Sequence, residues 1–391
     1  PLMAASILFK KKVILRNAPF VKDVLTMKDL LTSLGSKVEL KKEKKIIKII
    51  NNKKQKLIVP YNLVSTMRAG VLTMGPLLAR YPKSKIRVAL GGGCALGIRD
   101  TSWHLSGFKS LGADNTLNRG YVNIYSKNGL KGNIFKFPKV TVTGSSNLIM
   151  ASVLIKGEHI IKNISIEPEV KDLINSGAQI KFIGKRSIKI QGVNELVNGD
   201  HTIIGDRIEA FSYLCVAAIT NGRIKVKKID PKYLNAELRI LKKIGYKIEI
   251  NENTIMISPG KKRTPVSIKT GPWPQLATDN MPIILAVLTK VPGKSIIEET
   301  IFSNRFMAAP ELKRMGAKIL IKKNKAFIIG QKKLNAADCI SSDLRTTFSI
   351  ILGAISAEGS STISRIYHGL RGYENLQIKL KKLGIKIKLK K

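Results

Sequence analysis

Hydrophobic residues are spaced as in a helix in one segment of the chain and as in a strand in the next. Met27, Leu30, Leu31 and Leu34 follow an i, i+3, i+4, i+7 pattern, which places them on one face of a helix. Polar and apolar residues then alternate over 37–40, with the two-residue period of a half-buried strand. The pattern therefore predicts an amphipathic helix followed by a strand.

The end of this predicted helix is marked by a glycine, and the same junction recurs along the whole chain. Glycine enters the left-handed conformation that ends a helix without the steric penalty of a Cβ atom. The recurrence divides the chain into six copies, each longer than a solenoid repeat and therefore expected to be a small α/β sub-fold. The six glycines are Gly35, Gly112, Gly177, Gly245, Gly316 and Gly384.

Strands are expected on both sides of the later helix in each copy. Alternating runs after the glycine predict strands at 247–250 in the fourth copy and at 386–389 in the sixth. Similar runs at 222–226 and 293–297 predict strands ahead of the helices. The fold class is accordingly α/β, with sheet on one side of helix.

Six such copies are too many for one core of ordinary size, so two lobes of three copies each are expected. The polar turn at 198–200 lies near the middle of the chain, and we place an N-terminal lobe at 1–205 and a C-terminal lobe at 206–391. The 391 residues are 44% hydrophobic, which suffices for two buried cores. A ligand site is expected in the cleft between two such lobes.

The formal net charge of +43 is compatible with nucleic-acid binding, and a basic nucleic-acid-binding repeat protein is one alternative. Most of the cations, however, are lysines scattered over nearly every segment, and aromatic residues make up only 6% of the chain. Nucleic-acid sites favour focused arginines with interleaved aromatic residues. We therefore expect a solvated basic surface and no nucleic-acid partner.

Several classes of protein are excluded by what the sequence lacks. No apolar run approaches the roughly 18 residues that cross a bilayer, so no membrane association is expected. Three widely spaced cysteines give neither a disulfide framework nor a zinc site, and the four histidines share no ligand spacing. We expect a cytoplasmic protein that uses no metal ion and no cofactor.

A glycine-rich segment that contains a cysteine is the first candidate for chemistry. Gly91–Gly93 allow close approach of the backbone to a ligand, and Cys94 follows them directly. The guanidinium of Arg99 can lower the pKa of a nearby thiol and hold an anion with two parallel hydrogen bonds. The alternative is a hairpin with an incidental cysteine. Cys215 and Cys339 lie in apolar or mixed surroundings and are expected to be structural.

Other candidates lie in the second half of the chain. Asp279 follows the proline-rich loop 271–274, and loops on rigid scaffolds often carry function. Asp343 with Arg345, and Arg371 with Glu374, pair a cation with a carboxylate. Taken singly, these pairs could equally be surface ion pairs or helix caps, and Asp279 could be the N-cap of the apolar run that follows it.

An ordered set of short motifs over nearly the whole chain resembles the UDP-N-acetylglucosamine enolpyruvyl transferases, a branch of the enolpyruvyl transferase family. Each motif is weak alone, but their number and order make the resemblance specific. The motifs are 66–69, the loop through Arg99 and His104, 139–142, 167–169, 206–209, 278–279, 299–302, 304–307, 343–345, 365–368 and 371–374.

The resemblance implies a fold, a reaction and a place in metabolism. The fold is two lobes, each an inside-out barrel of three repeated α/β units. The reaction transfers enolpyruvyl from phosphoenolpyruvate to the 3-hydroxyl of UDP-N-acetylglucosamine by addition and elimination, and it releases phosphate. It is the first committed step of peptidoglycan precursor synthesis, and the family implies a monomer that acts on these two small molecules without a metal.

The resemblance also implies residue roles. Cys94 is similar to the proton donor of the family loop, which can also bond phosphoenolpyruvate covalently. Arg99 and Arg371 are similar to the arginines that hold this substrate, and Asp279 to the base that takes the hydroxyl proton. Asp343, as a catalytic residue, and Arg345, as a substrate-binding one, are similar to supporting groups near the reacting centre. Other residues that match the sugar-nucleotide site are Arg68, Asp100, Thr101, Ser102, Trp103, Lys139, Val140, Thr141, Val142, Glu167, Asp206 and Ile301.

Two further alternatives concern activity and substrate. Pro1 matches the family just after an N-terminal strand and a Lys-Asn pair whose lysine reaches the phosphate, so we expect the sequence to be an incomplete record. If it were complete, severe loss of activity would be expected, as in an inactive family member. The sister enzymes that act on shikimate phosphate share the fold but lack the Gly-Gly-Cys loop, and Cys94 argues against that substrate.

Overall fold

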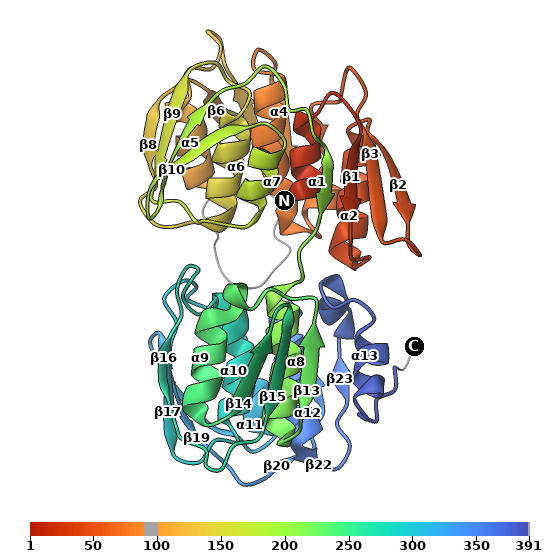
Figure 1. Cartoon of the computed structure of the whole chain (residues 1–391), viewed down its shortest axis with the longest axis vertical. Coiled ribbons are helices and arrows are strands. Elements are labelled where there is room, and N and C mark those ends of the chain that lie inside the picture. The colour runs from red at the N-terminus through yellow and green to blue at the C-terminus, as the bar shows by residue number, and fades with distance from the viewer. Residues whose placement is uncertain (90–100, 390–391) are drawn as a thin grey trace. The chain divides into compact units, whose positions relative to one another are not determined.

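The computed structural model describes residues 1–89 and 101–389, so the candidates Cys94, Arg99 and Asp100 lie outside the described residues. The described residues divide into two compact units, which we call unit 1 (residues 1–203) and unit 2 (residues 204–389) (Figure 1). Each unit has its own apolar core, with none of the buried apolar residues of one core belonging to the other among the described residues.

Unit 1 contains three α/β repeats, each with an inner helix, a strand, an outer helix and a hairpin (Figure 1). The first repeat comprises α1 (Leu2–Ala5) with η1 (Ser6–Leu8), β1 (Val13–Arg16), α2 (Lys22–Ser33), β2 (Lys37–Lys41) and β3 (Ile46–Ile50). The second comprises β4 (Ile58–Val59), α3 (Tyr61–Val64), η2 (Arg68–Thr73), α4 (Met74–Arg80), β5 (Ile86–Ala89), α5 (Ser102–Ser110), β6 (Asp114–Asn118) and β7 (Tyr121–Tyr125). The third comprises β8 (Ile134–Lys136), α6 (Val142–Ser152), β9 (Glu158–Lys162), α7 (Glu169–Asn175), β10 (Gln179–Gly184) and β11 (Ser187–Gln191).

The first two repeats of unit 2 follow the same plan, whereas the third has no strand after its outer helix among the described residues (Figure 1). The first repeat of unit 2 comprises α8 (Arg207–Thr220), β13 (Ile224–Lys227), η3 (Pro231–Leu234), α9 (Asn235–Ile244), β14 (Lys247–Asn251) and β15 (Thr254–Ser258). The second comprises β16 (Ser267–Lys269), η4 (Thr278–Asn280), α10 (Met281–Leu288), β17 (Lys294–Glu298), η5 (Arg305–Met307), α11 (Ala308–Arg314), β18 (Lys318–Lys322) and β19 (Lys325–Ile329). The third comprises β20 (Leu334–Asn335), β21 (Cys339–Ile340), α12 (Leu344–Ser356), β22 (Ala357–Glu358), β23 (Ile363–Ser364), η6 (Ile366–Arg371) and α13 (Leu376–Lys382).

The glycines predicted to end helices all adopt the left-handed backbone. Their φ angles are 99° at Gly35, 92° at Gly112, 96° at Gly177, 106° at Gly245, 89° at Gly316 and 83° at Gly384. A residue with a Cβ atom would be strained at each of these positions. The prediction of six copies with a common helix end is therefore confirmed, as is the α/β class of the fold.

The strands expected after the glycines form in five of the six copies. β14 covers the run predicted at 247–250, and β13 and β17 cover the runs predicted ahead of helices. The prediction of a strand at 386–389 is wrong, because the structure assigns no strand to residues 385–389. In the other copies this strand pairs with the next strand of a hairpin, and no such partner lies beside 385–389 in the described part of the chain.

Strand β12 (Asp200–Thr202) begins at the last residue of the polar turn predicted at 198–200. It pairs in parallel with β1 at the other end of unit 1, and the Arg16 guanidinium donates two hydrogen bonds, of 2.8 and 2.7 Å, to the Asp200 carboxylate. The sheet then has the order β12-β1-β3-β2, which matches β4-β5-β7-β6 and β8-β9-β11-β10. In unit 2, β16-β17-β19-β18 has this order, whereas β13-β15-β14 has three strands with β13 at an edge.

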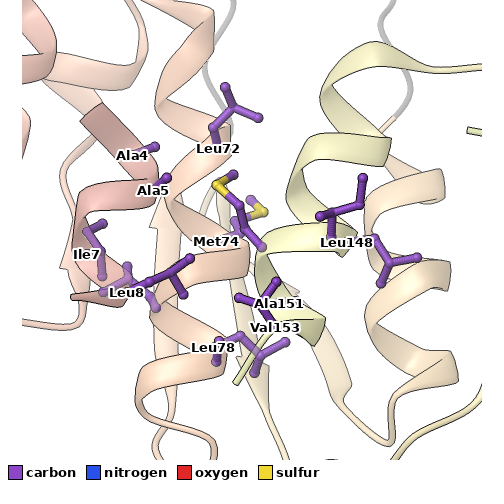
Figure 2. Packing of buried hydrophobic residues seen from close by; sticks show 14 of the residues in the cluster. Ala4, Ala5, Ile7, Leu8, Leu72, Met74, Leu78, Leu148, Ala151 and Val153 are labelled. Atoms are coloured by element: carbon purple, nitrogen blue, oxygen red, sulfur yellow. The ribbon is translucent and has the colours of Figure 1, made fainter. Parts of the chain in front are cut away.

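The core of unit 1 forms where its inner helices meet. Side chains of α1 and η1, of η2 and α4, and of α6 pack against one another (Figure 2). A Cβ atom on Gly75 would lie 2.1 Å from the backbone oxygen of Asn147, so only glycine allows this approach of α4 to α6. The Asn147 side chain joins the two segments by accepting from the Gly75 amide and donating to the Val71 carbonyl, each at 2.8 Å.

The core of unit 2 is built on α8, α10 and α12. All eight residues of α10 are buried, and Tyr213 of α8 meets Phe348 of α12 edge to face at 5.6 Å. Cys215 of α8 is fully buried, as predicted. Among the described residues, no helix combines the length and the apolarity that crossing a membrane requires.

Candidate active site

Three acidic residues stand at the beginnings of the inner helices of unit 2. Asp206 precedes α8, Asp279 lies in η4 just before α10, and Asp343 precedes α12. The Asp206 carboxylate accepts hydrogen bonds from the amides of Ile208 (2.7 Å) and Glu209 (3.1 Å), which makes it an N-cap.

Asp279 differs from the two capping residues. Asn280, not Asp279, holds the N-cap position of α10, so the alternative that Asp279 is only a helix cap does not hold. Its Oδ1 accepts a hydrogen bond of 2.7 Å from Nη2 of Arg305, and its Oδ2 accepts one of 3.2 Å from Nε of Arg345. The Asp279 side chain is 42% exposed whereas that of Arg305 is 2% exposed. Two arginines therefore hold an accessible carboxylate from its buried side.

Arg345 lies between this carboxylate and an aromatic ring. Its guanidinium carbon is 5.5 Å from the centre of the Tyr373 ring, and the Tyr373 hydroxyl is 2.8 Å from Oγ of Ser212. The negative charges of Asp279 and Asp206 both act on Arg345. Its Nη1 is buried and has no hydrogen-bond partner among the described residues.

Asp343 is a buried helix cap. Its Oδ1 accepts from the amides of Arg345 (2.9 Å) and Thr346 (3.1 Å), and its Oδ2 accepts from the Thr346 hydroxyl. The carboxylate thus binds the backbone of Arg345, while the Arg345 guanidinium binds Asp279. Of the alternatives that the sequence left open, the structure therefore shows the helix cap, which directs the Asp343 carboxylate towards the start of α12.

Cationic groups accompany the three carboxylates of this region. The positive ends of the α8, α10 and α12 dipoles accompany the buried guanidinium groups of Arg305 and Arg345. Helix N-termini with arginines nearby are suited to phosphate and carboxylate groups. Arg371, the last residue of η6, is a half-buried further cation of unit 2.

Three buried charged residues support Asp279, and sequence reasoning gave none of them a role. Arg305 also donates from Nε to the Thr278 carbonyl (3.0 Å). Glu237 accepts from the Asn280 side chain (2.9 Å), and Glu299 accepts from the Thr278 hydroxyl (3.0 Å). Glu237 could have been found, because its position three residues after Leu234 falls on the apolar face of α9.

Ile301 follows β17 and is 40% exposed. Its amide donates a hydrogen bond of 2.7 Å to Oε1 of Glu299, and the Phe302 amide donates to the same oxygen at 3.2 Å. One buried carboxylate therefore fixes the backbone of the segment that the sequence assigned to the sugar nucleotide.

In unit 1 the predicted site residues gather at the starts of two adjacent helices. Thr101, Ser102 and Trp103 begin α5, and Thr141 is the N-cap of α6, accepting from the Gly144 amide at 3.3 Å. His104 joins the two helices, because its Nδ1 lies 2.9 Å from Nδ2 of Asn147.

The other predicted residues of unit 1 lie at several places. Lys139 and Val142 are exposed, and Val140 is half-buried. Arg68 begins η2 and is half-buried. Glu167 is buried and accepts a hydrogen bond of 2.7 Å from the Ser165 hydroxyl.

Neither described cysteine has the character of a nucleophile. Burial raises the pKa of the Cys215 thiol well above its ordinary value, and burial followed by the charge of Glu311 raises the pKa of Cys339 to about 11. Within the described residues, no three His, Cys, Asp or Glu side chains are grouped so as to hold a metal ion.

Comparison with known proteins gives a consistent relationship over nearly the whole chain. The family described as EPSP synthase (3-phosphoshikimate 1-carboxyvinyltransferase) matches residues 1–380. A UDP-N-acetylglucosamine 1-carboxyvinyltransferase of Pelagibacter ubique is 47% identical over 99% of this chain and 93% of the relative. Proteins of the same name from Coxiella burnetii and Campylobacter jejuni are 40% and 42% identical, over 99% of this chain and over 90% and 93% of their own lengths.

Solved structures share the fold. The enolpyruvyl transferase NikO from Streptomyces tendae matches with a TM-score of 0.87 at 18% identity, over 98% of this chain and 92% of that one. EPSP synthase from Acinetobacter baumannii matches with a TM-score of 0.77 at 18% identity, over 100% of this chain and 95% of that one. The two-lobe α/β architecture expected from the sequence is therefore confirmed.

Proposed function

The chain belongs to the UDP-N-acetylglucosamine 1-carboxyvinyltransferases within the EPSP synthase family, and we propose that it catalyses the reaction for which these relatives are named. In this reaction the 3-hydroxyl oxygen of UDP-N-acetylglucosamine adds to C2 of phosphoenolpyruvate while C3 takes a proton. The tetrahedral intermediate then loses phosphate from C2 and a proton from C3, which leaves an enolpyruvyl ether. The product is a precursor of peptidoglycan.

The observation that carries the proposal is the accessible carboxylate of Asp279 held by two arginines. Ion pairs with Arg305 and Arg345 favour the ionised form of Asp279, which is the form that accepts a proton. The same pairs make it a modest base, so proton transfer depends on its orientation and reach. We assign Asp279 as the acceptor of the hydroxyl proton.

The cationic groups of unit 2 have a complementary role. The reaction moves negative charge onto the departing phosphate, and preorganised cations stabilise such charge. We assign Arg371 to the phosphoenolpyruvate anion, and Arg345 to the reacting centre, where its guanidinium binds Asp279. Asp343 acts on Arg345 through the backbone of α12.

The remaining assignments follow from the family. Cys94 donates the proton to C3, and Arg99 binds phosphoenolpyruvate. The family resemblance also assigns to the sugar nucleotide the exposed groups at the starts of α5 and α6, among them Ser102, Lys139 and Val142, and separately Ile301. Arg68, Asp100, Glu167 and Asp206 complete this set.

The chain is expected to work in the cytoplasm as a monomer. Both proposed substrates are phosphorylated metabolites of that compartment, and a net charge of +43 opposes self-association. Gel filtration coupled to light scattering should give a mass near 43.1 kDa. A stable dimer would contradict this assignment.

Phosphate release from phosphoenolpyruvate tests the proposed function. Release by the purified chain should require UDP-N-acetylglucosamine, and mass spectrometry should find the enolpyruvyl ether of that sugar nucleotide. Shikimate 3-phosphate is the control acceptor, because the matching family carries its name. Release that depends on shikimate 3-phosphate alone, or no release with either acceptor, would overturn the proposal.

A further inference from the structure

One buried carboxylate connects the turn that carries Asp279 with the segment that carries Ile301. Oε2 of Glu299 accepts from the Thr278 hydroxyl at 3.0 Å, and Oε1 accepts from the amides of Ile301 and Phe302. Glu299 is 2% exposed. Its three partners all donate hydrogen bonds, so an ionised carboxylate satisfies them together.

The backbone that carries the Glu299 side chain is itself held by hydrogen bonds. The Glu299 amide donates to the Asn324 carbonyl at 2.8 Å, and the Asn324 side chain donates to the Glu299 carbonyl at 3.1 Å. The next residue, Thr300, exchanges two hydrogen bonds with Thr270, of 3.0 and 2.9 Å. The Glu299 carboxylate therefore projects from a backbone held on both sides.

Thr278 receives this connection directly beside the proposed base. Its hydroxyl is bound by Glu299 and its carbonyl by Nε of Arg305, whose Nη2 binds Asp279. The two arginines weaken Asp279 as a base, so its reactivity depends on the orientation of its carboxylate. Thr278, the preceding residue, is held through both its hydroxyl and its carbonyl.

We propose that Glu299, acting through Thr278, is a positioning residue that sets the place of the Asp279 carboxylate relative to Ile301. The inference rests on the proposed function and adds to it a residue that does not touch the substrates. Its role is to hold Asp279, the proton acceptor, at a fixed position relative to Ile301, the apolar contact of the sugar nucleotide. A small displacement of a catalytic group can cost up to about 100-fold in rate.

The test uses substitutions at Thr278, because they break the connection and leave the bonds of Glu299 to Ile301 and Phe302 intact. Thr278→Val has nearly the same shape but no hydroxyl, and Thr278→Ser keeps the hydroxyl. We expect Thr278→Val to lower kcat by about 10- to 100-fold with the KM for UDP-N-acetylglucosamine changed less than threefold. Thr278→Ser should keep most of the wild-type kcat.

Thr289→Val is the matched control. Thr289 is fully buried whereas Thr278 is half-buried, and the Thr289 hydroxyl donates to the Ala286 carbonyl at the far end of α10 from Asp279. This variant also loses a hydroxyl and one hydrogen bond, at a more buried position, so it should lower the melting temperature at least as much as Thr278→Val while leaving kcat unchanged. If the role of Thr278 were only structural, Thr278→Val and Thr289→Val would have the same activity.

Glu299→Gln provides a second test of the connection. The Gln amide oxygen can accept from the two backbone amides while its NH₂ group donates to the Thr278 hydroxyl, which can also act as an acceptor. We therefore expect Glu299→Gln to keep much of the activity lost in Thr278→Val. The double variant Thr278→Val with Glu299→Gln should be as inactive as Thr278→Val, because valine has no hydroxyl to accept the hydrogen bond from the Gln side chain.

Hydrogen exchange distinguishes this inference from the proposed function. Amides of residues 276–281 should exchange faster in Thr278→Val than in the wild type, and not in Thr289→Val. If the wild type releases no phosphate, the proposed function fails and the connection is judged by exchange alone. Equal kcat in Thr278→Val and wild type, or equal exchange where activity is absent, would overturn the inference.

Discussion

Nη2 of Arg305 donates a hydrogen bond of 2.7 Å to Oδ1 of Asp279, and the arginine is buried while the carboxylate remains accessible. Since Nε of the same guanidinium binds the Thr278 carbonyl, the planar fork fixes both the carboxylate and the peptide unit before it. A lysine could supply the charge but not these two directions.

Arg305→Lys should therefore lower kcat while the protein stays folded. The loss of one charge-assisted hydrogen bond corresponds to about 1.5–3 kcal/mol, or roughly 10- to 100-fold in rate. Steady-state kinetics of phosphate release measures the effect. Arg239→Lys is the control, because Arg239 is exposed on α9 and donates to the Asn235 carbonyl. Equal kcat in the two variants would separate Arg305 from the reaction.

Asp343 should prove to act mainly as a helix cap. Asp343→Ala removes the acceptor of two backbone amides and should lower the free energy of unfolding by about 1–3 kcal/mol, as measured by urea denaturation. Asp343→Asn keeps an acceptor suited to an N-cap and should retain most of this stability.

The two variants also separate capping from a direct catalytic role. If Asp343 acts by placing the backbone of Arg345, activity should follow stability and be largely kept in Asp343→Asn. Full stability of Asp343→Asn combined with a loss of more than about 100-fold in kcat would instead assign the charge itself to catalysis.

The parts of the fold that local pattern determines could be predicted, and the parts that depend on distant pairing could not. The left-handed glycines are local, because the backbone at Gly245 needs φ of 106° whatever surrounds it. The strand β12 is different, because its three residues, Asp200–Thr202, form a strand only by pairing with β1. The short strand has too few residues to display a period, and so it was not predicted.

The same distinction applies to the candidate site. Asp279 and Arg345 were found as family motifs, but their mutual hydrogen bond joins segments of different repeats. Glu237 was not singled out, and Glu299 was matched as part of a motif but received no role, because a carboxylate in a sequence is expected to be exposed unless a partner is known. Their partners, Asn280 and Thr278, are neighbours only in the folded chain.

Thiol reactivity in the native protein should be confined to Cys94. Cys215 and Cys339 are buried, and their raised pKa values, about 11 for Cys339, keep them protonated at neutral pH. An electrophile such as an epoxide phosphate should label one thiol per chain at pH 7.5, whereas a disulfide reagent should find three thiols after unfolding. In Cys94→Ala the native count should fall to zero, and substantial labelling of that variant would contradict the assignment.

Glu237 should make the stability of the protein depend on pH. Burial raises the pKa of its carboxyl group above the ordinary value of 4.5, and hydrogen bonds from Asn280 and Ala277 only partly offset this. For a raised pKa the folded state binds the proton more tightly than the unfolded state. The stabilisation is therefore complete below about pH 4.5 and is lost as the pH rises through the folded pKa.

Glu237→Gln removes this titration while its amide oxygen can keep both hydrogen bonds made by Oε1. The free energy of unfolding should be measured in urea between pH 4 and pH 8. It should fall more steeply with rising pH in the wild type than in Glu237→Gln, and the two slopes should differ by at most about 1.4 kcal/mol per pH unit. Glu249→Gln on β14 controls for the lost charge, because Glu249 is exposed and carries no comparable hydrogen bonds in the described chain. Parallel curves of unfolding free energy against pH for the wild type and Glu237→Gln would contradict this prediction. They would mean that Glu237 binds its proton equally tightly in the folded and unfolded states, so that burial in unit 2 does not raise its pKa.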